Sequence, residues 1–236
     1  MSLGTGLSCF RRGVGLARSR PLRRFVWGPL AVSFVAISIL LVSGHALLEE
    51  AREWFVALTP DWLDWLDDVL APLLYLLGII AAGWLYGFVA VLLASPFLGA
   101  LSARAEREEF GAGPDFDENM GRAIVRAAAR EGRKLAYHLP RLIAMFVLTL
   151  IPVVNVAAPV FWFAFGAWML AVQFVDFAAE NRGLDFRDTV ALLRANRVAA
   201  FGLGAPAALL LAVPFAALVV IPAAVCGGAV LWRRLA

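Results

Sequence analysis

The stretch FVWGPLAVSFVAISILLVSGHALL, residues 25–48, is apolar throughout and carries one titratable side chain, His45. A helix of this length, at about 1.5 Å per residue, covers the ~30 Å hydrocarbon layer of a bilayer. It is too long for the apolar core of a cleavable signal peptide, which runs to about 7–15 residues. The stretch therefore predicts a retained transmembrane helix.

The chain as a whole is more apolar than a soluble domain. Of its 236 residues 62% are hydrophobic, and the mean hydropathy is +0.80. Soluble domains are about 45–50% apolar, so lipid must cover part of this excess. The net charge is only +3, and the basic residues cluster beside apolar stretches, which does not argue for nucleic acid. We therefore expect an all-α integral membrane protein with no nucleic-acid partner.

A second apolar run, residues 69–94, is also long enough to cross the membrane. Between the two runs, residues 49–69 are acidic and rich in tryptophan, which is typical of the bilayer interface. Residues 102–140 hold charges of both signs and predict a water-exposed helical region, with an amphipathic helix near 117–137.

Two further apolar pairs, residues 141–177 and 199–232, are interrupted by proline. The first arm, 141–151, ends before Pro152 and gives about 16–17 Å of helix, roughly half of the hydrocarbon thickness. Each pair is either two spanning helices or a hairpin that enters and leaves by one face, and the short first arm favours the hairpin. A turn at mid-bilayer needs protein or water to satisfy its backbone, so hairpins imply an oligomer or an internal cavity.

Charge sets the expected topology. The first 24 residues contain six arginines and no acid, which predicts a cytoplasmic N-terminus and an external 49–69 segment. Residues 102–140 then return to the cytoplasm. If both apolar pairs are hairpins, the C-terminus lies there too, and residues 1–236 form one membrane domain.

The candidate anion site is Leu22, Arg23 and Arg24. Pro21 is favoured at the first position of a helix, and Ser19 just upstream is a plausible cap. Free backbone N–H groups, the helix dipole and two guanidinium groups together suit a sulfate or phosphate. The alternative is that the arginines only orient the first membrane helix.

Other polar residues are open to two interpretations. Arg104, Glu106 and Arg107 follow a break after the second long run. They either border a pore entrance or form surface ion pairs beyond a helix stop, and the pattern alone favours the surface pairs. Gln173 and Asp176 lie one turn apart in an apolar segment, where polar residues suggest function. They either line a water path or lie at the interface.

Catalytic and metal-binding patterns are missing from the sequence. Cys9 and Cys226 are the two cysteines, and their positions support neither a zinc site nor a disulfide framework, so we expect small apolar fillers. There is no phosphate-binding loop of ATPases, no HExxH and no GxSxG. The sequence therefore disfavours an enzyme and suggests no cofactor or metal.

Five stretches in order resemble the bacterial CysZ sulfate transporter family, which shares a broader domain with EI24-type membrane proteins. These stretches are PLRRFVWGPL (21–30), SPFLGALSARAE (95–106), REGRKLAYHLPRLI (130–143), APVFWFAFGAWMLAVQFVDF (158–177) and IPAAVCGGAVLW (221–232). They span nearly the whole chain, so their order makes the resemblance specific.

The resemblance implies uptake of sulfate across the bacterial inner membrane for assimilation into cysteine. It implies two long transmembrane helices, two helix pairs that penetrate partway, and assembly into a homo-oligomer surrounded by membrane lipids. Sulfate would bind at Leu22, Arg23 and Arg24, and Glu106 matches an acidic position of an inner charged network. Leu98 departs from the polar residue common in relatives, which puts a ligand role there in doubt.

Two functions compete on this basis. The first is a channel-like sulfate permease, passive or ion-coupled, with Arg104, Glu106 and Arg107 bordering the path. The second is a non-transporting membrane scaffold or assembly factor of the EI24 type, which would use the arginine pair for lipid headgroups.

Overall fold

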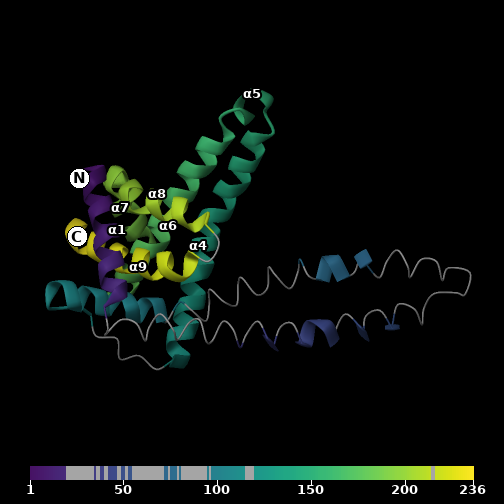
Figure 1. The fold of residues 1–236 in the computed structure, drawn as a ribbon, viewed down its shortest axis with the longest axis horizontal. Coiled ribbons are helices and arrows are strands. Elements are labelled where there is room, and N and C mark those ends of the chain that lie inside the picture. Colours follow the sequence, from purple (N-terminus) through teal and green to yellow (C-terminus); the bar gives the residue numbers. More distant parts are fainter. Residues whose placement is uncertain are drawn as a thin grey trace, which may run out of the picture. The chain divides into compact units, whose positions relative to one another are not determined.

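The protein is described by a computed structural model that covers residues 1–19, 95, 97–114, 120–213 and 216–236. It also describes short pieces at 35, 38–39, 42–46, 49–50, 53–54, 72–73, 75–78 and 80. The chain divides into two units, one of Met1–Gly28 with Ser95–Ala236 and one of Pro29–Ala94 (Figure 1). Where the described residues form regular structure it is helical, which confirms the all-α class.

A helical hairpin projects from the first unit. Its elements are α4 (Met120–Thr149), the single turn α5 (Pro152–Asn155) and α6 (Ala158–Glu180), with α5 at the tip (Figure 1). Pro152 opens α5 and a proline lies in the first turn of α6, positions where the missing N–H costs nothing. The turn expected after residue 151 is therefore confirmed.

The first arm of this hairpin differs from the expectation. The amphipathic helix near 117–137 and the apolar arm 141–151 are one continuous helix, α4, with Pro140 inside it. A proline within a helix removes one backbone hydrogen bond and can leave the helix kinked but unbroken. The expected border between residues 102–140 and 141–177 consequently falls inside a single element.

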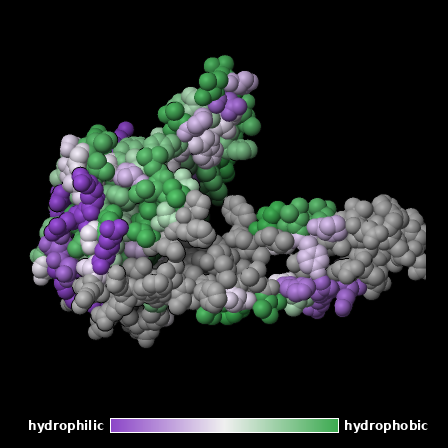
Figure 2. All heavy atoms as spheres, in the orientation of Figure 1, coloured by the Kyte–Doolittle hydropathy of each residue, from purple (hydrophilic) through white to green (hydrophobic). Residues whose placement is uncertain are grey.

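The outer half of the hairpin exposes its apolar side chains. Val153 and Val156 in the tip are 84% and 88% exposed. Others along both arms are also exposed: Phe146, Val147, Leu148, Leu150, Ile151, Val160, Phe161 and Phe163. Figure 2 shows this apolar surface around the projecting end. Within this unit the protein itself leaves the surface uncovered.

Residues 3–18 form a helix, α1 (Leu3–Arg18), within the basic N-terminal stretch, where no helix was predicted. Its buried side consists of residues 6, 9, 10, 13 and 16, a helical spacing. The helix was not predicted because two of these five residues are glycines, which are poor helix formers. A Cβ on Gly6 would lie 2.0 Å from the Ala199 oxygen, and one on Gly13 would lie 2.1 Å from the Ala223 oxygen. Small residues therefore let α1 approach its neighbours closely, as in membrane helix pairs.

Those neighbours are α8 (Arg197–Leu211) and α9 (Ala217–Leu235), which pack with α1 and α6 into the core of the unit. Cys9 and Cys226 are free and buried in this core, as expected of apolar fillers. The polar stretch before α8 contains a helix that we did not predict, α7 (Phe186–Ala195). Asp185 caps it: its carboxylate accepts from the Phe186 N–H at 2.7 Å, and its own N–H donates to Asp188 at 3.3 Å.

Among the described residues, α6 is the one helix long and apolar enough to cross a membrane, with 23 residues and a mean hydropathy of 1.6. Its two halves differ. The half next to the tip is largely exposed or half-buried, whereas nearly all of residues 171–180 are buried within the unit. Length and hydropathy alone therefore overstate how much of α6 is available to lipid.

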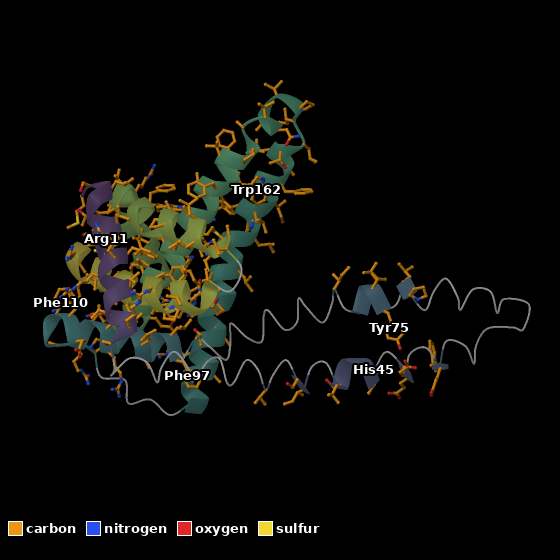
Figure 3. All side chains as sticks on the ribbon, viewed as in Figure 1. Arg11, His45, Tyr75, Phe97, Phe110 and Trp162 are labelled. Carbon is orange, nitrogen blue, oxygen red and sulfur yellow. The ribbon has the colours of Figure 1, made fainter. Side chains whose placement is uncertain are left out.

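The second unit contains the two long apolar runs, 25–48 and 69–94, most of which lies outside the described residues. Residues 42–46 and 75–78 within these runs are helical. His45 and Tyr75 face each other with ring centroids 6.4 Å apart (Figure 3), and the Tyr75 hydroxyl donates to the Glu49 carboxylate. Contacts of this kind tie the end of the first run to the start of the second.

Candidate functional site: a buried charged base

The expected sulfate-binding residues, Leu22, Arg23 and Arg24, lie outside the described residues. The structure describes the chain up to Ser19. There α1 has just ended at Arg18, and Ser19 adopts extended backbone with φ −64° and ψ 145°. The anion site at the start of the first long run therefore remains a prediction.

Glu106 is buried on the helix formed by residues 97–110. Its carboxylate binds the Arg182 guanidinium through two atoms: Nη1 donates to Oε1 at 2.8 Å, and Nη2 donates to Oε2. The charge and hydrogen bonds of Glu106 raise the pKa of Arg182 above its usual value. Paired in this way, the buried carboxylate and the guanidinium satisfy each other's charge and hydrogen bonds.

Arg104 and Arg107 lie on the exposed side of the same helix. The Arg107 Nη2 donates to the Pro114 oxygen at 3.2 Å. The cation beside Glu106 is thus Arg182, from the turn after α6, and sequence reasoning missed it because the two residues are 76 positions apart. In the same turn, Asn181 donates to the Gly99 oxygen at 2.8 Å and ties α6 to the 97–110 helix.

Asp176 is the centre of a second buried group of charges. Its carboxylate accepts hydrogen bonds from Arg130 Nε at 2.9 Å and from Thr189 Oγ1 at 2.9 Å, and Lys134 Nζ lies 3.3 Å away. Lys134 also binds Glu131 at 2.8 Å. Asp176 and Lys134 are 0% and 1% exposed. We call Arg130, Glu131, Lys134 and Asp176 the buried charged base.

The interpretation of Asp176 as a water-path or interfacial residue is not supported by these contacts. It lies inside the unit, where α4, α6 and α7 meet, and every partner named above is a protein side chain. Gln173, expected beside it, donates to Glu131 at 3.4 Å and belongs to the same group. Glu180 is also buried beside this group and lies 3.8 Å from Arg126, so three cations and three anions balance, as a low-dielectric interior requires.

His138 lies on α4 one turn beyond Lys134 and before the apolar arm. Its ring packs edge-on against Tyr137, with centroids 5.0 Å apart, and lies 6.4 Å from the Phe186 ring. Burial first, and then the charges of Lys134 and Arg141, lower the pKa of His138 to about 4. The imidazole is therefore neutral at physiological pH.

No group of three His, Cys, Asp or Glu side chains in the described part of the chain is placed to hold a metal ion. Several of the described polar residues of this unit form buried ion pairs, in which arginine and lysine side chains bind the carboxylates of Glu106 and Asp176. Such charges in apolar surroundings are found where ions are handled or where helices must be held in register.

Comparison with known proteins gives a consistent answer. The family model described as "Sulfate transporter CysZ/Etoposide-induced protein 2.4" matches residues 9–222. A protein named sulfate transporter CysZ from Pseudomonas paraeruginosa is 36% identical over 231 residues, covering 94% of this chain and 92% of that protein.

Two relatives with the same name come from other genera. The protein from Vibrio parahaemolyticus is 33% identical over 233 residues, covering 97% of this chain and 94% of its own length. The protein from Salmonella enteritidis is 35% identical over 236 residues, covering 97% and 91%. With a family model that matches most of its length and relatives that align nearly end to end, the chain belongs to the CysZ/EI24 family of membrane proteins.

Proposed function

We propose that this protein is a sulfate transporter of the bacterial inner membrane that supplies sulfate for assimilation into cysteine. One observation carries the proposal: relatives named sulfate transporter CysZ align with more than nine-tenths of this chain and of their own lengths. The apolar composition and the family assignment support a membrane transporter and speak against an enzyme.

Sulfate binds, in this proposal, at Leu22, Arg23 and Arg24. The helix α1 ends at Arg18 and Ser19 is extended, so the chain has left α1 before Pro21, a residue favoured in the first turn of a new helix. The first backbone N–H groups of that helix then lie beside two guanidinium groups. A dianion gains from both, since exposed amides and planar donor forks suit tetrahedral oxyanions.

The membrane arrangement that we propose has two long helices, 25–48 and 69–94, that cross, and two pairs, 141–177 and 199–232, that penetrate partway. The exposed tip of the α4–α6 hairpin supports partial entry. From residue 141 to its end, α4 provides about 14 Å of helix, less than half of the ~30 Å layer. A tip at mid-bilayer needs a second copy or an internal cavity around it, which supports a homo-oligomer.

The ion path runs past Glu106 in this proposal, with Arg104 and Arg107 at its entrance. The burial of Glu106 and the exposure of the two arginines support an inner and an outer position. Residues 1–24, 102–140 and the C-terminus lie in the cytoplasm, following the charge pattern. Because the sequence shows no phosphate-binding loop of ATPases, we propose channel-like flux without hydrolysis.

Sulfate flux into liposomes that contain the purified protein tests the proposal. We expect flux above that of empty vesicles, and strong loss in the variant Arg23→Ala/Arg24→Ala. The matched control is Arg187→Ala/Arg194→Ala, which removes two exposed arginines from α7. Equal losses in both variants, or no flux in the unchanged protein, contradict the proposal. A scaffold gives neither flux nor thermal stabilisation by sulfate at constant ionic strength.

A further inference from the structure

Five exposed arginines lie on two helices, α1 and α9, that pack together, with Arg18 about 15 Å along α1 from the end beside Arg234. Arg11, Arg12 and Arg18 lie on α1, which has no acidic residue, and Arg233 and Arg234 form the last turn of α9. The two helices pack together, and Arg234 Nη1 lies 3.3 Å from the Ser8 hydroxyl, 226 positions away. We call these five residues the arginine face. Figure 2 shows hydrophilic side chains gathered over this end of the unit.

The outward side of α1 combines apolar and basic side chains. Leu3 and Leu7 are 54% and 39% exposed, and Arg11 and Arg18 continue the same side at helical spacing. The opposite side of the helix is buried in the core. A helix that presents leucines and then arginines outward fits a membrane interface, where leucine enters the acyl boundary and arginine reaches the headgroups.

Among the described residues, two acids at the end of the 97–110 helix stand near the arginine face. Glu109, at the end of the 97–110 helix, accepts from Arg12 Nε through both oxygens, at 2.9 and 2.8 Å, and its side chain is only 10% exposed. Glu108 beside it is exposed. Arg233 lies over the ring of Phe110 at 5.6 Å (Figure 3 labels Phe110 and Arg11). The exposed Arg11, Arg18 and Arg234 leave this surface with excess positive charge.

We propose that the arginine face binds the phosphate groups of anionic phospholipid headgroups. Guanidinium forks match phosphate oxygens, and basic clusters next to membrane segments are attracted to anionic leaflets. The exposed leucines beside the arginines favour a lipid surface over a nucleic acid or an acidic protein, neither of which offers an acyl layer. The proposal does not rest on sulfate transport, because Arg23 and Arg24 are not part of this face.

The test uses the full purified chain in a neutral detergent, with phosphatidylglycerol or phosphatidylcholine added at equal total lipid and equal ionic strength. We expect phosphatidylglycerol to raise the midpoint of thermal unfolding by about 4 °C or more over phosphatidylcholine. The variant Arg11→Gln/Arg233→Gln/Arg234→Gln should lose most of this shift. The control variant Arg187→Gln/Arg194→Gln/Arg197→Gln removes three exposed arginines elsewhere on the unit and should keep it.

A second variant separates charge from packing. Phe110→Leu removes the ring under Arg233 and keeps all five arginines, so it should keep most of the shift. If it loses as much as the glutamine variant, the contact of Arg233 with Phe110 is responsible and the proposal is overturned. It is also overturned if inorganic phosphate gives the same shift as phosphatidylglycerol, or if the α7–α8 control loses as much as the arginine-face variant.

A single variant covers the case in which the triple variants do not fold. Arg11→Gln leaves the Arg12–Glu109 pair and the Arg233–Phe110 contact in place. In native mass spectrometry, the unchanged protein should retain phosphatidylglycerol in preference to phosphatidylcholine, and Arg11→Gln should lower that ratio. An unchanged ratio overturns the proposal.

Discussion

The two ends of the α4–α6 hairpin are formed by the same helices but differ in exposure and in charge. At the tip, Val153 and Val156 are almost fully exposed, and no charged residue occurs from 142 through 175. At the other end, Asp176 and Lys134 are buried and paired. The apolar end is exposed on the surface of the unit and the charged end is buried inside it, the reverse of a soluble protein.

This contrast shows what hydropathy measures and what it leaves out. An apolar stretch such as α6 can be covered by lipid along one half and by protein along the other. The protein-covered half is the place where charges are tolerated, because partners from α4 and α7 are available there. Substitutions at the charged end should therefore act on the packing of the protein, and substitutions at the tip should act on its contact with lipid.

The largest effect is expected for Asp176→Asn. This change leaves Arg130 and Lys134 buried without their shared anion, although Asn has nearly the same shape. Removing one partner of a buried ion pair costs about 3–5 kcal/mol, so we expect a large fall in the thermal midpoint in detergent. Asp188→Asn, on the exposed side of α7, is not a matched control because it also caps that helix. Glu108→Gln, which neutralises an exposed carboxylate on the 97–110 helix, is a better one.

A charge at the tip should act only in the membrane. Val156→Lys places an ammonium group where we propose hydrocarbon, at a cost of about 3 kcal/mol near the bilayer centre. Stability in detergent micelles should barely change, because Val156 contacts little of the protein. The thermal midpoint of the protein reconstituted in liposomes should fall, while Val156→Leu stays at the level of the unchanged protein. A tip that tolerates lysine in the bilayer contradicts partial entry.

The next effect is a dependence of folding stability on pH, caused by His138, which lies on α4 between the buried charges and the apolar tip. The pKa of His138 is about 4 in the folded protein, against 6.5 for the free side chain. Between these values the unfolded chain binds a proton that the folded chain does not, so folding stability falls as the pH drops from about 6.5 towards 4. For this partly buried group we expect a loss of roughly 2 kcal/mol.

Carboxylates titrate in the same range, so the measurement is a difference. The thermal midpoints of the unchanged protein and of His138→Gln are compared from pH 7 to pH 4.5, all in the same detergent. The gap between them should narrow or reverse as the pH falls, because the variant has no imidazole to protonate. A gap that stays constant with pH shows that His138 does not control this part of the stability.

The sequence predicted those features that depend on a few neighbouring residues, such as a proline or a short apolar run. The breaks at Pro152 and before α6 are confirmed, as are the free cysteines as core residues. The helix α1 was not predicted, because two of the five residues on its buried side, Gly6 and Gly13, are glycines, which are poor helix formers. The family was recognisable from five short stretches taken in order, and it is confirmed.

The partners of the buried charges were out of reach for a physical reason. Arg130 and Asp176 are 46 positions apart, and Glu106 and Arg182 are 76 apart. Only the packing of α4, α6 and the 97–110 helix decides which cation meets which carboxylate. By sequence distance alone, Arg104 and Arg107 would be expected to pair with Glu106. Both lie on the exposed side of their helix, whereas Glu106 is buried.

The smallest effect is expected for an ion pair on the outside of the charged end. Arg133 Nη1 lies 3.3 Å from the Asp185 carboxylate, and both side chains are more than half exposed, at 58% and 52%. Water screens such a pair, so Arg133→Gln should cost no more than about 0.5 kcal/mol. The neighbouring Arg130→Gln should cost several times more, since it strips a buried carboxylate of its partner. Equal losses in the thermal midpoint would mean that burial does not set the strength of these pairs, and the contrast between the two ends of the hairpin would then need another cause.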